Sequence, residues 1–159
     1  MTAIDIVDLD CLGPDQRTQL AQIMTQAWPG WYGTAGQGDA SADIAARAEG
    51  GDFPIGLAAL IDGRAIGTVA LSHQSFGQEA GETCWLTGLV VAPEHRGQGI
   101  AGRLVAAVAD LAKRRGHASI CTTTQSARSL LERQHWLHIR DVVDDDRAIW
   151  HVLSKSLAP

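Results

Sequence analysis

Three glycines at positions 97, 99 and 102 have the spacing that points most directly to chemistry in this chain. They follow an apolar run, residues 86–91, and precede residues 100–111, where apolar side chains recur at helical spacing. The first N–H groups of a helix have no intrahelical partner, and the helix dipole makes that end attractive to anions. Glycines let phosphate oxygens approach such a backbone closely. The segment therefore predicts a pyrophosphate site and, with it, a nucleotide cofactor.

Two familiar nucleotide motifs do not fit this segment. The spacing of Gly97, Gly99 and Gly102 matches the dinucleotide fingerprint, but residues 92–96 separate the first glycine from the strand. The next apolar run ends in Thr122-Thr123-Thr124, without the acidic residue that would bind a ribose. A P-loop is excluded because no Gly-Lys-Ser/Thr follows.

Residues 90–101 instead resemble the acetyl-CoA motif of the GNAT superfamily of N-acetyltransferases. Its Gln/Arg-x-x-Gly-x-Gly/Ala core is matched by Arg96, Gly99 and Ala101, and Pro93 stands in the usual preceding frame. The resemblance covers about residues 55–153. It implies the GNAT acyl-CoA N-acyltransferase fold, an α/β fold in which a mixed central sheet with splayed parallel strands is flanked by helices. It also implies acetyl-CoA as co-substrate and acetyl transfer to a primary amine.

The resemblance assigns cofactor contacts to three places in the chain. The pantetheine arm would contact the strand backbone at Leu89, Val90 and Val91, and Thr124 and Ser129 would lie near the thioester and the cofactor tail. The pyrophosphate would accept N–H groups from the turn, which comprises Arg96, Gly97, Gln98, Gly99, Ile100, Ala101 and Gly102.

The usual acid and base of the family are missing. Leu131 stands where many relatives have a tyrosine that protonates the departing thiolate, and Trp85 stands where some have a glutamate base. A CoA thiol has a pKa of about 8.5, so its thiolate can leave with only water to protonate it. The base would be a water chain that accepts the amine proton, anchored by His73, Glu82, Thr87 or Ser129, of which His73 and Glu82 are the catalytic candidates. The alternative is a non-catalytic acyl-CoA-binding or regulatory module with the same fold.

Aromatic residues indicate where the acceptor would bind. Trp28, Trp31 and Tyr32 belong to the connection between the first two expected helices, which overhangs the acceptor in this fold. Trp85 lies in a Thr-Cys-Trp-Leu stretch similar to the strand entrance of a GNAT subgroup. A small amine, an aminoglycoside-like molecule and a peptide N-terminus all remain open as acceptors.

Composition sets wider limits. We expect one domain over residues 1–159, and a net charge of −5 argues against nonspecific nucleic-acid binding. The apolar runs are too short for a membrane span, and three widely spaced cysteines suit a reducing compartment, so we expect a cytoplasmic location without membrane association. No metal site is expected, because His135 and His138 straddle a helix end and a strand. A homodimer stays open, since dimers are common in this fold.

Apolar periodicity and turn residues predict the order of elements. Asp62-Gly63 predicts a tight hairpin turn, Pro29 the end of the first helix and Gly116 the end of the cofactor helix. Strands are expected near residues 4–7, 55–61, 65–71, 84–91, 118–124, 136–143 and 148–153, and helices near 14–27, 39–49, 99–115 and 126–134.

Overall fold

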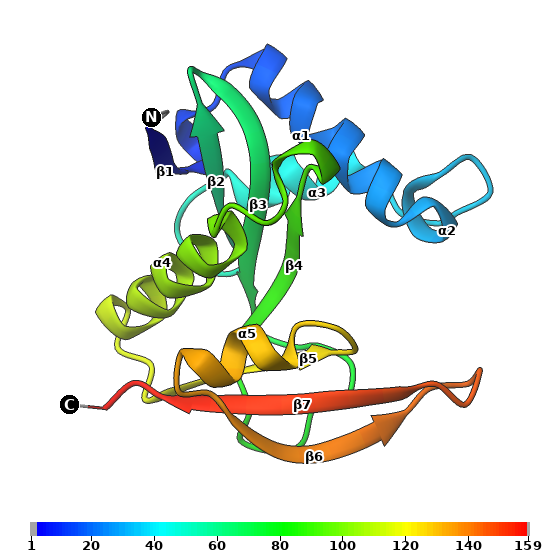
Figure 1. Cartoon of the computed structure of the whole chain (residues 1–159), viewed down its shortest axis with the longest axis vertical. Coiled ribbons are helices and arrows are strands. Elements are labelled where there is room, and N and C mark those ends of the chain that lie inside the picture. The colour runs from blue at the N-terminus through cyan, green and yellow to red at the C-terminus, as the bar shows by residue number, and fades with distance from the viewer. Residues whose placement is uncertain (1–2, 159) are drawn as a thin grey trace.

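The computed structural model describes residues 3–158 and has one seven-stranded sheet in the order β1-β2-β3-β4-β5-β7-β6 (Figure 1). The strands are β1 (Ile4–Asp8), β2 (Ile55–Ile61), β3 (Arg64–Ser72), β4 (Trp85–Val91), β5 (Ser119–Thr124), β6 (Leu137–Val143) and β7 (Ile149–Ser156). The helices are α1 (Pro14–Ala27), α2 (Pro29–Tyr32), α3 (Ala40–Arg47), α4 (Ile100–Arg114) and α5 (Arg128–Arg133). The predicted order is confirmed, and the sequence did not predict the short helix α2.

Local sequence signals explain several of these boundaries. Pro14 occupies the first turn of α1, where its missing N–H costs no hydrogen bond, and the Gln16 side chain accepts from the Gly13 N–H at 3.0 Å. Asp62 and Gly63 adopt φ values of 49° and 78°, as the tight turn between β2 and β3 requires. Gly116, with φ of 88°, follows the end of α4.

The sheet is packed on both faces. Leu104 and Val108 of α4 belong to the largest buried cluster, together with Ile66 and Leu71 of β3. Leu20 and Met24 of α1 form a second cluster with Ile44 of α3. No helix in residues 3–158 is long and apolar enough to cross a membrane.

The parallel strands β4 and β5 are joined at one end only. Their single register pair is Trp85 with Cys121, and the Cys121 N–H donates to the Cys84 carbonyl at 2.9 Å. The Thr122 hydroxyl adds a hydrogen bond to the Leu86 carbonyl at 3.0 Å. Beyond that point the strands diverge, and β5–β7 run across the direction of β2–β4 (Figure 1). The predicted splay of these strands is therefore confirmed, and it divides the molecule into two arms.

Candidate functional site

The turn before α4 forms a hollow of about 390 Å³. Gly97 and Gly99 have φ values of 77° and 80°, a backbone conformation that residues other than glycine rarely adopt. Gly99 is the N-cap of α4 and supplies no side-chain hydrogen bond, which leaves the first N–H groups of the helix to a ligand. Arg96, Gly97, Gly99 and Gly102 line this hollow. Such a cradle fits the pyrophosphate of a CoA-type cofactor.

Two arginines supply positive charge at the same hollow. The Arg96 side chain is held against β4, because its Nε donates to the Val91 carbonyl at 3.1 Å. Arg133 of α5 also lines this hollow, and Gln134 Nε2 donates to the Gly102 carbonyl at 2.8 Å, which holds α5 beside the turn. Sequence reasoning missed Arg133, because only the tertiary fold brings α5 to the glycine turn.

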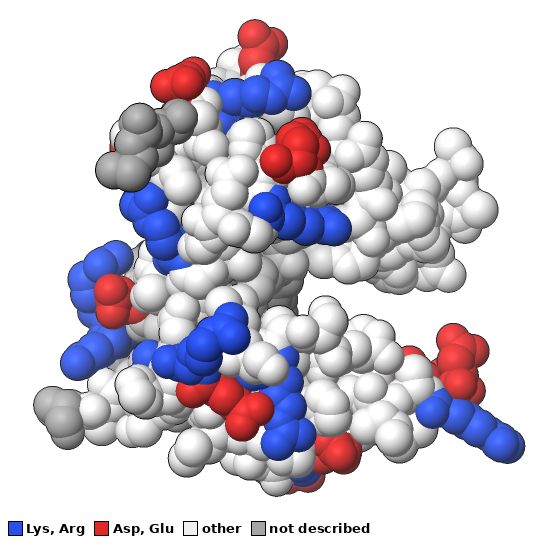
Figure 2. All heavy atoms as spheres, viewed as in Figure 1, with Lys and Arg blue, Asp and Glu red and all other residues white. Residues whose placement is uncertain are grey.

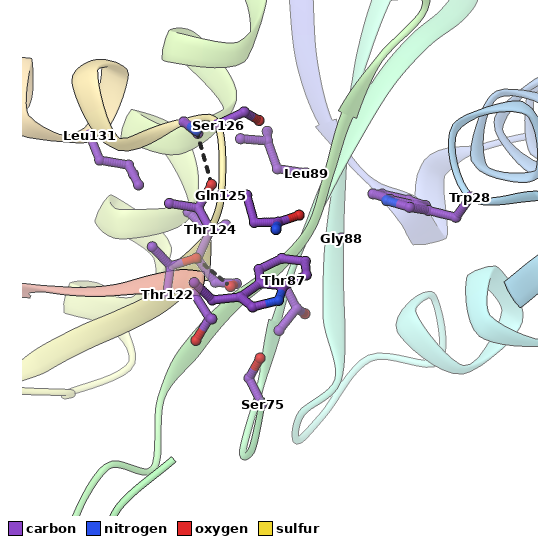
Figure 3. A pocket seen from close by; sticks show the side chains of 14 residues that line it. Trp28, Ser75, Thr87, Gly88, Leu89, Thr122, Thr124, Gln125, Ser126 and Leu131 are labelled. Carbon is purple, nitrogen blue, oxygen red and sulfur yellow. Dashed lines mark hydrogen bonds between the residues drawn. The ribbon is translucent and has the colours of Figure 1, made fainter. Parts of the chain in front are cut away.

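The second part of the site is a cleft of about 350 Å³ between the diverging strands (Figure 3). Its floor comprises Thr87, Gly88 and Leu89 of β4 and Thr122–Thr124 of β5, followed by Gln125 and Ser126. Trp28 lines the cleft from the other side of β4 than the β5 side chains. The structure thus places Leu89 and Thr124 on the cleft, where the resemblance assigned them.

A bulge in β4 shapes the middle of the cleft. Thr68 of β3 pairs with Val90 and Ala70 pairs with Thr87, so Gly88 and Leu89 together oppose Val69. Gly88 has φ of 63°, and a Cβ there would lie 3.1 Å from Arg47 Nη1. A bulge leaves one residue out of the hydrogen-bond ladder. Its backbone can therefore serve a ligand, such as the oxyanion of a tetrahedral intermediate.

Glu82 is bound in an ion pair instead of facing the cleft. Its two carboxylate oxygens accept from Arg140, Oε2 from Nη1 at 2.9 Å and Oε1 from Nη2 at 2.5 Å. These hydrogen bonds lower the pKa of Glu82. The carboxylate is thus a poor proton acceptor, and it is not among the described residues that line the cleft. The structure gives no support to its assignment as a catalytic residue, and its hydrogen bonds to Arg140 hold the loop after β3 onto β6.

His73 is likewise engaged elsewhere. Its Nε2 lies 3.3 Å from Asp52 Oδ2, and its ring lies 4.8 Å from the ring of Phe53. The side chain is half exposed and, among the described residues, does not line the cleft. The structure therefore gives no support to its assignment as a catalytic residue.

The aromatic candidates separate into one that lines the cleft and three that do not. Trp28 lines it. Trp85 is not among the described residues that line the cleft, because its side chain is fully buried with Cys121 and Val152. Trp31 is 52% exposed and lies against Gly38.

Tyr32 holds α2 to α3. Its hydroxyl donates to Asp43 Oδ2 at 2.6 Å, and burial together with this hydrogen bond raises its pKa to about 12. The phenol thus stays protonated at neutral pH and is already bonded, so the structure gives it no part in the cleft wall.

The polar residues after β5 also differ from expectation. Ser129 is exposed on α5 and does not line either hollow among the described residues, whereas Ser126 lines the cleft. Leu131 is buried and lines the cleft, so the position that carries a tyrosine in many relatives is an apolar wall here. Ser72 and Thr87 hydroxyls lie 2.9 Å apart at its edge.

A smaller hollow of about 270 Å³ adjoins the cleft and was not predicted. Its walls are Ser75, Phe76, Thr123, Asp144 and Trp150, of which Ser75, Thr123 and Trp150 also line the cleft. The rings of Phe76 and Trp150 stand edge to face at 6.1 Å, and Trp150 Nε1 donates to Asp144 Oδ2 at 2.8 Å. Figure 2 shows the opening between the two arms as a notch with mainly uncharged walls and with charged residues at the end of the lower arm.

Comparisons with known proteins agree with this geometry. A family model described as the acetyltransferase (GNAT) family matches residues 17–136. An aminoglycoside 6'-N-acetyltransferase complexed with coenzyme A superposes with a TM-score of 0.79 at 15% identity over 98% of both chains. The aminoglycoside 6'-N-acetyltransferase from Enterococcus faecium gives 0.76 at 15% identity, again over 98% of both. An N-acetyltransferase from Staphylococcus aureus Mu50 gives 0.76 at 14% identity over 98% of this chain and 99% of the other. No curated protein sequence matches significantly.

Proposed function

This chain belongs to the GNAT family of acetyltransferases, with acetyl-CoA as co-substrate and an amine as acceptor, and we propose that the acceptor is a compact primary amine with one positive charge beside an apolar group. The observation that carries this proposal is the hollow walled by Phe76, Trp150 and Asp144, which opens into the cleft between β4 and β5. An aromatic wall favours an apolar or ring group and attracts cations over its face.

The charge of the hollow that Phe76, Trp150 and Asp144 form limits the choice of acceptor further. Asp144 is the one carboxylate among the described residues that line the cleft and the hollow. Its pKa is lowered by hydrogen bonds from Trp150, Ala148 and Asp146, so it stays ionised at neutral pH. One carboxylate matches one ammonium group, whereas an aminoglycoside carries several. Two of the solved structures named above are aminoglycoside 6'-N-acetyltransferases, and we expect this chain to differ from them in acceptor.

The chemistry that we propose relies on solvent for proton transfer. The neutral amine attacks the thioester carbonyl, its nitrogen loses a proton, the C–S bond breaks, and the CoA sulfur takes up a proton. No carboxylate, histidine, lysine or tyrosine is present among the described residues of the cleft itself. The hydroxyls of Thr87 and Ser126 can orient the water that accepts the amine proton and the water that protonates the CoA sulfur. The bulge at Gly88 supports stabilisation of the oxyanion.

An acceptor panel tests the proposal. We expect acetyl-CoA turnover with arylalkyl amines to exceed turnover with aminoglycosides and with peptide N-termini. Asp144→Asn should raise KM for the preferred amine and leave kcat less affected, whereas Asp145→Asn, an exposed neighbour in the same turn, is the matched control. A preference for aminoglycosides, or an unchanged KM in Asp144→Asn, would contradict the acceptor assignment. Tight acetyl-CoA binding without turnover on any amine would favour the non-catalytic module instead.

We propose a cellular location and an oligomeric state for this chain. All three cysteines are free, as in proteins of reducing compartments, which supports a cytoplasmic location. We keep a homodimer as the alternative to a monomer, and sedimentation of the full chain distinguishes them.

A further inference from the structure

Two histidines and an aspartate meet on the C-terminal hairpin, outside the residues that line the cleft. His138 Nε2 lies 2.6 Å and His151 Nδ1 lies 2.7 Å from the same atom, Asp141 Oδ1. One ligand atom from each residue falls within 4.8 Å of the other two. The two imidazoles stand edge to face with ring centroids 5.6 Å apart.

A bulge in β6 brings this His-Asp-His cluster together. His138 and Asp141 are three residues apart, and in a regular strand that spacing puts side chains on opposite faces. Here His138 pairs with Leu153 and Asp141 pairs with His151, and the register shifts between His138 and Arg140. Because Leu153 and His151 are two residues apart on β7, their partners share one face. Bulges are common at sheet edges, where β6 lies, and next to active sites, where they re-aim side chains.

We propose that His138, Asp141 and His151 form a binding site for a divalent transition-metal ion such as Zn²⁺. Two imidazole nitrogens and one carboxylate oxygen are a ligand set that suits this ion, with a water completing a tetrahedron. Ligand atoms around a tetrahedral zinc lie about 3.3 Å apart, so the two short N–O separations must open by about 0.6 Å. Small side-chain rotations allow this, because the three side chains are 28%, 48% and 26% exposed.

The site is built from two adjacent strands, so a bound ion cross-links β6 to β7. His151 also pairs with Thr124, the last residue of β5, which lines the cleft. An ion at the cluster therefore restrains the strand that carries one wall of the acetyl-transfer site. This inference is independent of the proposed acceptor, because it rests on residues outside the cleft and the adjoining hollow.

Zinc titration of the untagged, EDTA-treated full chain tests the site. Calorimetry should show saturable binding of one Zn²⁺ per chain, and Zn²⁺ should raise the midpoint of thermal unfolding, because a ligand of the folded state stabilises it. His138→Ala and His151→Ala should each weaken the affinity at least about tenfold, since loss of even an outer partner of a metal ligand costs that much. His73→Ala is the matched control, since it removes a half-exposed histidine that lies beside Asp52, away from the cluster.

Two further variants keep the test decisive. His151→Gln retains a hydrogen-bond donor toward Asp141 and much of the side-chain volume, and Asp141→Asn retains the shape of the carboxylate. Both should fold in EDTA with the thermal midpoint of the unaltered chain and should lose Zn²⁺ binding. Absence of saturable binding in the unaltered chain would overturn the proposal and leave a hydrogen-bonded cluster. Equal affinity in the His138→Ala/His151→Ala double variant would overturn it as well.

Discussion

The pair of Glu82 and Arg140 allows a quantitative test of whether Glu82 anchors the fold or accepts a proton. Both side chains are only 18% exposed and form two hydrogen bonds with each other. Arg140 also donates to the Gly77 carbonyl at 2.6 Å, so it links β6 to the loop that carries Ser75 and Phe76. Glu82→Gln keeps the shape of the side chain and removes its charge.

The expected cost follows from the burial of this pair. Hydrogen bonds to charged groups contribute about 1.5–3 kcal/mol to stability. Because both side chains are largely buried, water can do little to replace the hydrogen bonds that Arg140 loses. We expect Glu82→Gln to lower the free energy of unfolding by about 2–3 kcal/mol. For a chain of this length the thermal midpoint should then fall by about 5–10 °C.

Thermal and urea unfolding at neutral pH measure the effect. Glu79→Gln is the matched control, because Glu79 lies 3.5 Å from Arg140 Nη1 but is 67% exposed. Its effect should stay below about 0.5 kcal/mol. Arg140→Gln should cost a similar amount to Glu82→Gln, and the double variant should cost less than the sum, because both changes remove the same interaction.

The pH dependence of the difference has a definite sign. The pKa of Glu82 is lowered in the folded chain by the hydrogen bonds from Arg140. Its stabilisation is therefore fully present above the unfolded pKa of about 4.3 and is lost as the pH falls through the folded value. The gap between the unaltered chain and Glu82→Gln should thus close in acid. An unchanged midpoint, combined with a drop in kcat/KM that is largest near neutral pH, would refute the anchoring role and restore Glu82 as a base.

Four further variants test the cofactor turn and the cleft. Gly99→Asp should abolish acetyl-CoA binding in calorimetry, because it adds bulk and negative charge where φ is 80°, and Arg96→Ala should weaken binding less, since backbone N–H groups remain. Unchanged affinity in Gly99→Asp would refute the pyrophosphate assignment. Gly88→Ala should lower kcat in steady-state assays, because its Cβ would meet Arg47 at a backbone φ of 63°, and unaltered kcat would argue against a role of the bulge. Leu131→Tyr should raise kcat only if thiolate departure limits the rate, since general acids contribute about 10²–10⁴-fold; unchanged kcat would support protonation by water.

Features that depend on neighbouring residues could be predicted from the sequence. The Asp62-Gly63 turn and the end of α4 at Gly116 follow from positive φ values at a few adjacent residues. The glycine turn before α4 follows from the same reasoning, and the family resemblance then implied a mixed sheet with splayed parallel strands. The short helix α2 escaped prediction, because a four-residue helix has too few residues for a periodic signal.

Partners across the fold could not be predicted. Glu82 and Arg140 are separated by 58 positions, and only the placement of β6 beside the loop after β3 brings them together. Trp150, Asp144 and Phe76 form a hollow because the C-terminal hairpin folds against that loop. The His-Asp-His cluster depends on a one-residue bulge. The alternation of apolar and polar residues in the sequence does not reveal such a register shift.

The residues that were expected at the candidate site and the residues that line it differ for a common physical reason. A search for titratable side chains named His73 and Glu82, yet both are engaged with Asp52 and Arg140 away from the cleft. The cleft and the turn offer backbone groups where the bulge at Gly88 and the left-handed glycines 97 and 99 free them for a ligand. Backbone donors can position the thioester and stabilise its oxyanion without a perturbed pKa. An amine with a pKa near 10 is neutral in only about one molecule in a thousand at pH 7. The rate should therefore follow the free-amine fraction, and glycine geometry is a better guide to this site than a search for acids and bases.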